Sequence, residues 1–264
     1  MPENPKPLSR HLILGLSHIY GETEDIDKQV AFWQSRGLTM EFAWNLLVPD
    51  EKKQKLLHNQ NASCVDLSYL NFSKPMVGPG IEFICHKPIN RQTRRSANSA
   101  LTLLMQAPEK RDVEDDEGNR IISSPGCSAP VCLVAATVDI KASGNFLATL
   151  GFKKVTLDQR EEKEIGEIFS CAGVCWEFRL PLYSRLGVRV LLMEDKTRDF
   201  EPKVDELGWS GFSFLTPSLD EVERRFPLQA RQMIKTQEAG EREVAFYNSS
   251  GLLVEFLKIT AKRK

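Results

Sequence analysis

The stretch LSHIYGETEDIDKQVAFWQSRGLTM, residues 16–40, carries three structural signals in succession. Its first residues continue the apolar, β-compatible segment Leu12–Ile19, which predicts a strand. Thr23 can then cap a helix whose apolar residues follow a roughly helical spacing. Gly37 is placed to end that helix in the left-handed conformation. The stretch therefore predicts a strand, a helix and the start of a second strand.

Three further strand candidates complete this first unit, and they are Leu38–Leu47, Cys64–Phe72 and Gly80–His86. The unit has the order strand, helix, strand, strand, strand, or βαβββ. Such a unit forms a four-stranded sheet with one open face. Two units side by side make a curved eight-stranded sheet, because each unit can then bury an edge strand and share a cavity with its partner.

The same order of elements returns in the second half of the chain. Aligned without a gap, Asp25-Ile26…Phe32…Gly37-Leu38 matches Asp139-Ile140…Phe146…Gly151-Phe152. The elements predicted for this copy are Val131–Val138, a helix from Ile140 to Leu150, Phe152–Leu157, Ile168–Leu180 and Val188–Met193. A recurring order of elements with matching residues indicates an internal repeat.

A third full copy begins at Phe212–Leu215, where Ser218 and Glu221 form a capping-box pattern before a helix at 218–226. Its remaining strands are predicted at Gln232–Thr236, Arg242–Tyr247 and Leu252–Ile259. A shorter segment lies before the second full copy and contains Leu101–Gln106, the acidic turn Asp115-Asp116-Glu117-Gly118, and Ile121-Ile122. This segment is either a fourth copy that has lost its helix or a linker hairpin.

These repeats predict an α+β protein of repeated βαβββ modules that form curved mixed, mainly antiparallel sheets around a cavity. The expected domains are an N-terminal half at residues 10–128, whose second module is shortened, and a C-terminal half at residues 129–260. The pairing of the modules stays open. Adjacent modules can pair, or the first module can pair with the last.

The composition is that of a globular protein. Of 264 residues 41% are apolar, and the formal net charge of −1 gives no global field that favours nucleic acid or an anionic membrane. The first residues carry no apolar run, and no stretch is apolar for long enough to form a helical span. The six cysteines are therefore expected to be reduced thiols in a cytoplasmic protein. We expect a small-molecule ligand and no nucleic-acid or membrane partner, and the sequence leaves a monomer and a homodimer open.

Short motifs carry a family resemblance over most of residues 10–259. The opening strand, helix and second strand contain Leu16-Ser17-His18-Ile19, Asp25-Ile26-Asp27, Phe32-Trp33 and Gly37-Leu38, and the closing strands contain Gly80-Ile81-Glu82-Phe83 and residues 248–257. These motifs resemble the vicinal oxygen chelate superfamily. That superfamily includes glyoxalase I, extradiol ring-cleaving dioxygenases, fosfomycin-modifying enzymes and bleomycin-resistance binding proteins.

The resemblance implies a set of metal ligands. In that family a first-strand histidine or glutamine and a last-strand glutamate of each module hold a divalent ion, which stabilises an enediolate or holds oxygen beside a catechol. Carried over by position, the ligands are His18 and Glu82 in the first module and Glu255 in the last. His11 is the rival of His18, because it takes the same place if seven residues are inserted.

The other modules depart from the family pattern. The resemblance puts Cys132 at the histidine place and Arg189 at the glutamate place of the second full module. The last module has Gly211 at the histidine place, and the shortened module has Ile122 at the glutamate place. If the last two modules pair, Arg189 and Glu255 are expected to form an ion pair in place of an ion.

If instead the first and last modules pair, His18 (or His11), Glu82 and Glu255 converge. One imidazole and two carboxylates suit Fe, Mn or Zn. The sequence leaves a divalent metal and a metal-free site open. His86 shares a strand face with Glu82, but its place at the strand end predicts exposure to solvent.

Three functions are compatible with these observations. The first is a metal-dependent lyase or dioxygenase that uses His18, Glu82 and Glu255. The second is a metal-free protein that binds and sequesters a planar compound, as resistance proteins do, and its candidate cavity walls are Trp44, Tyr69, Trp176 and Phe178. The third is a structural or interaction protein whose own side chains fill the cavity.

Overall fold

The computed structural model describes residues 11–47, 63–72, 79–87, 101–125, 131–169, 173–179, 188–195, 208–236, 240–250 and 252–258. The strands are β1 (Gly15–Glu22), β2 (Leu38–Leu47), β3 (Cys64–Phe72), β4 (Gly80–Lys87), β5 (Leu101–Gln106), β6 (Arg111–Glu114), β7 (Arg120–Ser124), β8 (Val131–Thr137), β9 (Lys153–Val155), β10 (Val174–Phe178), β11 (Val188–Glu194), β12 (Gly208–Thr216), β13 (Ala230–Thr236), β14 (Gly240–Ser249) and β15 (Leu252–Lys258). The helices are α1 (Ile26–Gln34), α3 (Ile140–Thr149), α4 (Gln159–Phe169) and α5 (Leu219–Glu223).

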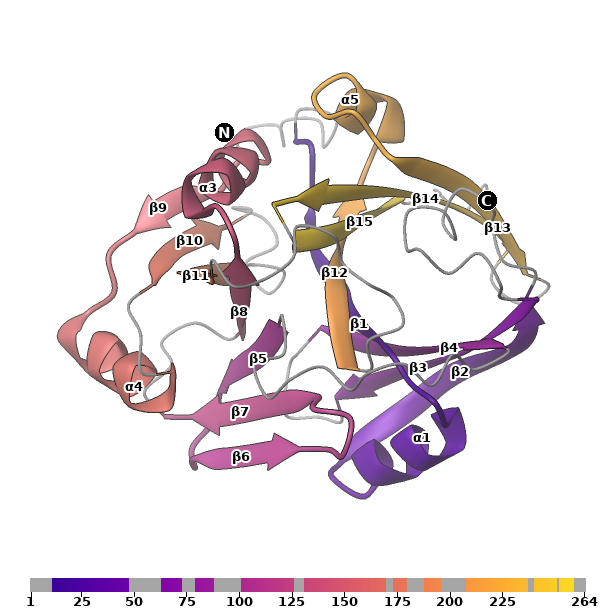
Figure 1. Ribbon diagram of the computed structural model, residues 1–264, viewed down its shortest axis with the longest axis horizontal. Coiled ribbons are helices and arrows are strands. Elements are labelled where there is room, and N and C mark those ends of the chain that lie inside the picture. Colours follow the sequence, from indigo (N-terminus) through magenta and orange to yellow (C-terminus); the bar gives the residue numbers. More distant parts are fainter. Residues whose placement is uncertain are drawn as a thin grey trace, which may run out of the picture.

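The strands form two curved sheets that lie side by side (Figure 1). The larger has eight strands in the order β13-β14-β15-β12-β1-β4-β3-β2, and the smaller has seven in the order β6-β7-β5-β8-β11-β10-β9. Both sheets are mixed and mainly antiparallel, so the predicted α+β class is confirmed. None of the helices in the described ranges is long and apolar enough to cross a membrane.

The first module pairs with the last. Strands β1 and β12 run antiparallel at the centre of the larger sheet and join two modules from opposite ends of the chain. Strands β5 and β8 make the corresponding contact in the smaller sheet. Each sheet therefore contains strands from both halves of the chain, and the division at residues 128 and 129 stays a prediction about folding units.

The shortened segment is built like the end of a full module. Its first and last strands, β5 and β7, are parallel neighbours, as β1 and β4 are in the first module. Strand β6 then pairs antiparallel with β7, as β3 does with β4. This arrangement supports the interpretation as a fourth copy without its helix.

Local signals set the helix ends. Asp25 and Asp139 are the N-caps of α1 and α3, and the carboxylate of each accepts hydrogen bonds from backbone N–H groups of the first turn. The expected cap Thr23 lies before the helix, where its hydroxyl accepts a hydrogen bond from the N–H of Asp25. Gly37 and Gly151 follow the two helices with φ of 93° and 100°, so both end signals are confirmed.

Helix α4 was not predicted. The sequence favoured a strand from Ile168 to Leu180, whereas the chain is helical to Phe169 and β10 begins at Val174. In Figure 1 this helix lies against the inner side of the smaller sheet, while α1 and α5 lie on the outer side of the larger one. The helix therefore covers a face that the repeat pattern leaves open.

The acidic turn between β6 and β7 docks the smaller sheet onto α1. Glu117 is buried there, and its carboxylate accepts hydrogen bonds from the Thr23 hydroxyl at 2.9 Å, the Glu24 N–H at 3.0 Å and the Gln29 side-chain amide at 2.8 Å. Burial raises the pKa of Glu117 to about 7, although these hydrogen bonds lower it. A buried carboxyl group therefore links the acidic turn of the smaller sheet to α1, beside the apolar core that the two sheets share.

Candidate functional site

The inner face of the larger sheet carries the polar groups. Along β1, Ile19 points into the core that packs against the helices, while His18, Tyr20 and Glu22 point to the opposite face. The same alternation on β4 puts Glu82 on the inner face. Period-two side-chain direction therefore brings a histidine and a glutamate together on neighbouring strands.

His18, Glu82 and Glu255 converge on this face. The Nε2 atom of His18 lies 3.4 Å from Oε1 of Glu255 and 3.8 Å from Oε2 of Glu82. All three side chains are largely shielded from water, with exposed fractions of 4%, 7% and 13% in the order His18, Glu255, Glu82. The three residues come from β1, β15 and β4, so the pairing of the first and last modules assembles the group.

Two serines orient this group. Ser213 on β12 donates a hydrogen bond of 2.7 Å to Oε1 of Glu255, the oxygen that faces His18. The Nδ1 atom of His18 lies 3.1 Å from the hydroxyl of Ser17. If Nδ1 carries the proton and donates a hydrogen bond to the hydroxyl of Ser17, the lone pair of Nε2 faces the two carboxylates.

Two tyrosines flank the imidazole of His18, and two glycines make room for them. The ring of Tyr69 stands edge-on to His18 with centroids 5.6 Å apart, and the ring of Tyr20 lies 6.2 Å away on another side. A methyl group on Gly80 would overlap the Tyr69 hydroxyl, and one on Gly211 would overlap the Tyr20 hydroxyl. Gly211 is the histidine place of the last module, so Tyr20 fills the space next to the missing ligand.

Aromatic rings extend from this group across β2 and β3. Phe42 stacks on Tyr69 with centroids 4.9 Å apart and on Trp44 at 4.5 Å, and all three rings are half-buried. The prediction that Trp44 and Tyr69 line the inner face fits this arrangement. The two other candidates, Trp176 and Phe178, lie elsewhere.

Trp176 and Phe178 face the outer side of the smaller sheet. Trp176 packs beneath α3, so closely that a methyl group on Gly144 would lie 2.7 Å from its ring. Phe178 packs on Phe152 in the core with centroids 5.4 Å apart. Their prediction as cavity walls is wrong, because the alternation along β10 turns these two side chains away from the inner face.

A second histidine–glutamate pair lies further along the same face. Nδ1 of His86 lies 2.8 Å from Oε2 of Glu22, and both side chains are buried. The predicted exposure of His86 is wrong, because β1 continues to Glu22 and covers this end of β4. The pair was not recognised in the sequence, although Glu22 shares a strand face with His18.

The donor types of the first group fit a divalent ion, and its spacing is nearly suitable. Two ligands of one ion bound at about 2.1 Å lie about 3.0 to 3.4 Å apart. The His18–Glu255 separation is within this range, whereas Glu82 must move by a few tenths of an ångström. Within the described ranges, no group of three or more His, Cys, Asp or Glu side chains already has metal-binding geometry. His11 precedes β1, so the structure places His18 rather than His11 beside the carboxylates.

The register of the parallel strand pairs defines the glutamate place in each module. Glu82 lies opposite the residue two positions after His18. Glu255 lies opposite the residue two positions after Gly211, the histidine place of the last module. Both modules of the larger sheet therefore follow one rule.

The same rule corrects the assignment in the smaller sheet. Cys132 lies opposite Arg189, so the glutamate place, two positions further on, is Leu191. The expected ion pair between Arg189 and Glu255 is also wrong, because it required pairing of the last two modules, which belong to different sheets. Arg189 instead lies 2.8 Å from carboxylate oxygens of both Glu161 and Glu177.

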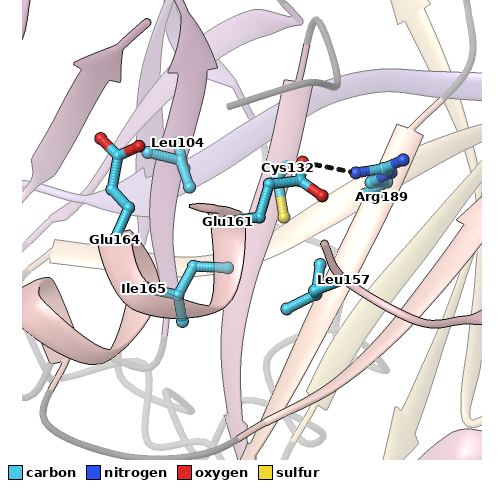
Figure 2. Close-up of a pocket in the computed structure, with 7 residues that line it drawn as sticks. All are labelled: Leu104, Cys132, Leu157, Glu161, Glu164, Ile165 and Arg189. Carbon is cyan, nitrogen blue, oxygen red and sulfur yellow. Dashed lines mark hydrogen bonds and ion pairs between the residues drawn. The ribbon is translucent and has the colours of Figure 1, made fainter. Parts of the chain in front are cut away.

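The inner face of the smaller sheet is filled by α4. Its buried apolar residues pack with Ile165 of that helix, and they are Leu104, Ile122, Cys132, Val134, Cys175 and Leu191. A small hollow remains between α4 and the sheet, and Figure 2 shows Arg189 and Glu161 paired at its edge. A hydrogen bond from Cys132 lowers the pKa of Cys175, and the Arg189 charge lowers it further.

Comparison with known proteins gives a structural likeness only. No family model matches the chain, and no curated protein matches its sequence. Glyoxalase I from Zea mays is similar in structure, with a TM-score of 0.58 and 11% identity over 92% of each chain. A point mutant of the same enzyme gives a TM-score of 0.59, also at 11% identity and over 92% of each chain.

This likeness extends over both sheets and confirms at the level of the fold what the short motifs indicated. The chain has the fold of glyoxalase I.

Proposed function

We propose that the protein is a divalent-metal-dependent lyase or dioxygenase that acts on a small molecule at the inner face of the larger sheet. The observation that carries the proposal is the convergence of His18, Glu82 and Glu255 from three strands, with separations of 3.4 and 3.8 Å at Nε2 of His18. The ligands would be these three side chains and the ion Fe, Mn or Zn, because two of the three donors are carboxylates.

The charge of the group supports this proposal. If both carboxylates are ionised and the imidazole is neutral, the group carries a charge of −2 in a region shielded from water, and burial of unbalanced charge is costly. A divalent cation brings the three groups to neutrality. The ion, when bound, would supply Lewis-acid stabilisation of oxygen atoms of the substrate.

The remaining residues have positioning roles in this proposal. Ser213 fixes one oxygen of Glu255, and Ser17 selects the histidine tautomer whose Nε2 is a ligand. Tyr20 fills the space at the histidine place of the last module, which leaves an ion with three protein ligands and open positions for substrate oxygens. Phe42 and Trp44 supply an apolar wall beside the group.

The test is the metal content of purified protein after supplementation with Fe, Mn or Zn and removal of the excess. We expect about one ion per chain in the wild type and a large loss in His18→Ala, Glu82→Ala and Glu255→Ala. His86→Ala is the matched control, because it removes another buried histidine of the same face and should keep the ion. A wild-type content well below one ion per chain overturns the proposal.

Metal-free binding of a planar compound is the second candidate, and the stacked rings of Phe42, Trp44 and Tyr69 favour it. Metal-stripped protein would then bind planar aromatic compounds, and the bound compound would quench the tryptophan fluorescence of the protein. Trp44→Phe should abolish this quenching, while Trp176→Phe, which changes a tryptophan under α3, should preserve it. Loss of all binding on metal removal would exclude this candidate.

A further inference from the structure

We infer that the hollow between α4 and the smaller sheet is a binding site for a small apolar monocarboxylate, and that the side chain of Glu161 occupies the place of the ligand carboxylate in this structure. The site lies on the other sheet from the proposed metal centre, so the two proposals stand or fall separately.

The lining of the hollow combines one cation and two carboxylates with apolar surface. Its residues are Leu104, Cys132, Leu157, Glu161, Glu164, Ile165 and Arg189 (Figure 2). Arg189 is the cationic residue in this lining, and most of the other surface is aliphatic side chain. Such a lining matches a ligand with a negatively charged head and a short apolar tail.

Two carboxylate partners of Arg189 come from different elements. Glu177 lies on the neighbouring strand β10, directly opposite Arg189 in the register, and accepts a hydrogen bond from Nε at 2.8 Å. Glu161 belongs to α4 and accepts one from Nη1, also at 2.8 Å. The carboxylate on one side of the guanidinium therefore belongs to the sheet. The carboxylate on the other side belongs to α4 and moves with that helix. A ligand carboxylate can make the same charge-assisted hydrogen bond.

Helix α4 contacts the sheet along one side. Glu161 and Ile165 are its buried residues, Ile168 and Phe169 pack half-buried against the same apolar cluster, and Glu164 accepts a hydrogen bond from Ser124 of β7. Gly166 lies in its interior, where glycine weakens a helix. No atom lies within 4 Å of a methyl group placed on Gly166, so packing does not require a glycine there. The interior glycine lowers the cost of moving this helix aside, while the ion pair and the apolar contacts oppose that movement.

The charges at the hollow restrict the ligand further. Glu161 and Glu164 both line the hollow, and their carboxylates disfavour a second negative charge on the ligand. Dicarboxylates and phosphate esters are therefore disfavoured, and a monocarboxylate fits. The tail would lie against Leu104, Leu157 and Ile165.

Octanoate is the probe, and its binding is measured by calorimetry below its aggregation concentration. We expect saturable binding to the wild-type protein and about tenfold tighter binding to Glu161→Gln, which removes the competing charge. Octanol, which has the same tail without the carboxylate, should bind at least tenfold more weakly than octanoate. Equal binding of octanoate and octanol, or an unchanged dissociation constant in Glu161→Gln, overturns the inference.

Three variants locate the site. Glu162→Gln removes a charge from the exposed side of the same helix and should bind octanoate as the wild type does. Gly166→Ala should weaken binding about fourfold, because alanine stabilises the closed helix. Arg189→Lys keeps a positive charge beside Glu161 and Glu177. Lysine cannot donate hydrogen bonds to two carboxylates in the geometry of a guanidinium, so this variant should lose most of its affinity for octanoate. Full octanoate affinity in folded Arg189→Lys contradicts the assignment of the head-group contact.

Discussion

The two sheets present similar frames with opposite contents on their inner faces. In the larger sheet the glutamate places of both modules hold Glu82 and Glu255, and aromatic rings beside them are half-buried. In the smaller sheet one glutamate place holds Leu191, Ile122 is buried nearby, and α4 covers the face. The two sheets share the pairing of their strands, but the side chains on their inner faces are polar in the larger sheet and apolar in the smaller one.

This difference shows which residues separate a polar site from a structural core on one scaffold. Parallel pairing of first and last strands fixes the position of the glutamate place, which holds a carboxylate in both modules of the larger sheet and Leu191 in the smaller one. The inserted helix supplies apolar cover only in the smaller sheet. Single substitutions on each face should therefore have different effects in the two sheets.

Arg189→Met should produce the largest loss of stability. The change leaves the buried carboxylate of Glu161 and the half-buried one of Glu177 without their shared cation, which costs about 3 kcal/mol in the free energy of unfolding. Urea denaturation measures this loss. Arg179→Met is the control, because Arg179 also contacts Glu177 but is mostly exposed, and its loss should be within about 0.5 kcal/mol. Equal effects of the two changes would show that the smaller sheet is not held by a buried ion-pair network.

Gly211→Ala should destabilise the larger sheet by about 2 kcal/mol, because the added methyl group overlaps both the Tyr20 hydroxyl and the backbone oxygen of Leu253. Gly166→Ala in α4 is the matched change on the smaller sheet and meets open space. It should raise the free energy of unfolding by up to about 1 kcal/mol. Thermal unfolding of both variants checks the signs, and a stabilising Gly211→Ala would contradict the close approach of Tyr20.

Glu117→Gln should have a smaller, pH-dependent effect at the contact between the sheets. The folded-state pKa of about 7 lies above the ordinary value of 4.5, so the fold favours the protonated carboxyl. This contribution to stability is fully present below about pH 4.5 and is lost as the pH rises through about 7. The wild type should therefore lose stability relative to Glu117→Gln over this interval.

Urea denaturation at about pH 5 and about pH 8 measures the effect. Glutamine at position 117 can keep the contacts. Oε1 of Gln29 is buried without a hydrogen-bond partner, and a rotation of the Gln29 side-chain amide by 180° lets this oxygen accept a hydrogen bond from the new glutamine. Glu109→Gln, an exposed change outside this turn, is the control. The same pH dependence in wild type and Glu117→Gln would remove Glu117 as its source.

The local parts of this fold could be read from the sequence because their signals are local. Asp25 and Gly37 bracket α1 as caps, and Asp139 and Gly151 do the same for α3. Module pairing could not be derived, since adjacent pairing and first-with-last pairing bury the same kind of strand edge. The convergence of the candidate ligands therefore stayed conditional until the structure showed β1 beside β12.

Two misses have different causes. The signal for α4 was present, because the N–H of Glu161 bonds to the side chain of Asp158, and Ile165 and Phe169 follow at helical spacing. The repeat pattern, which has no helix at this place, overrode it. The partner of His86 could not be found locally, since Glu22 is far away in sequence and meets it only through the pairing of β1 with β4.

Anomalous diffraction from crystals grown with Mn or Zn tests the difference between the two faces most directly. The account predicts one anomalous peak per chain, between Nε2 of His18 and the carboxylates of Glu82 and Glu255, and none beside Cys132 in the smaller sheet. A peak at Cys132, or full metal occupancy elsewhere with none at His18, would contradict it.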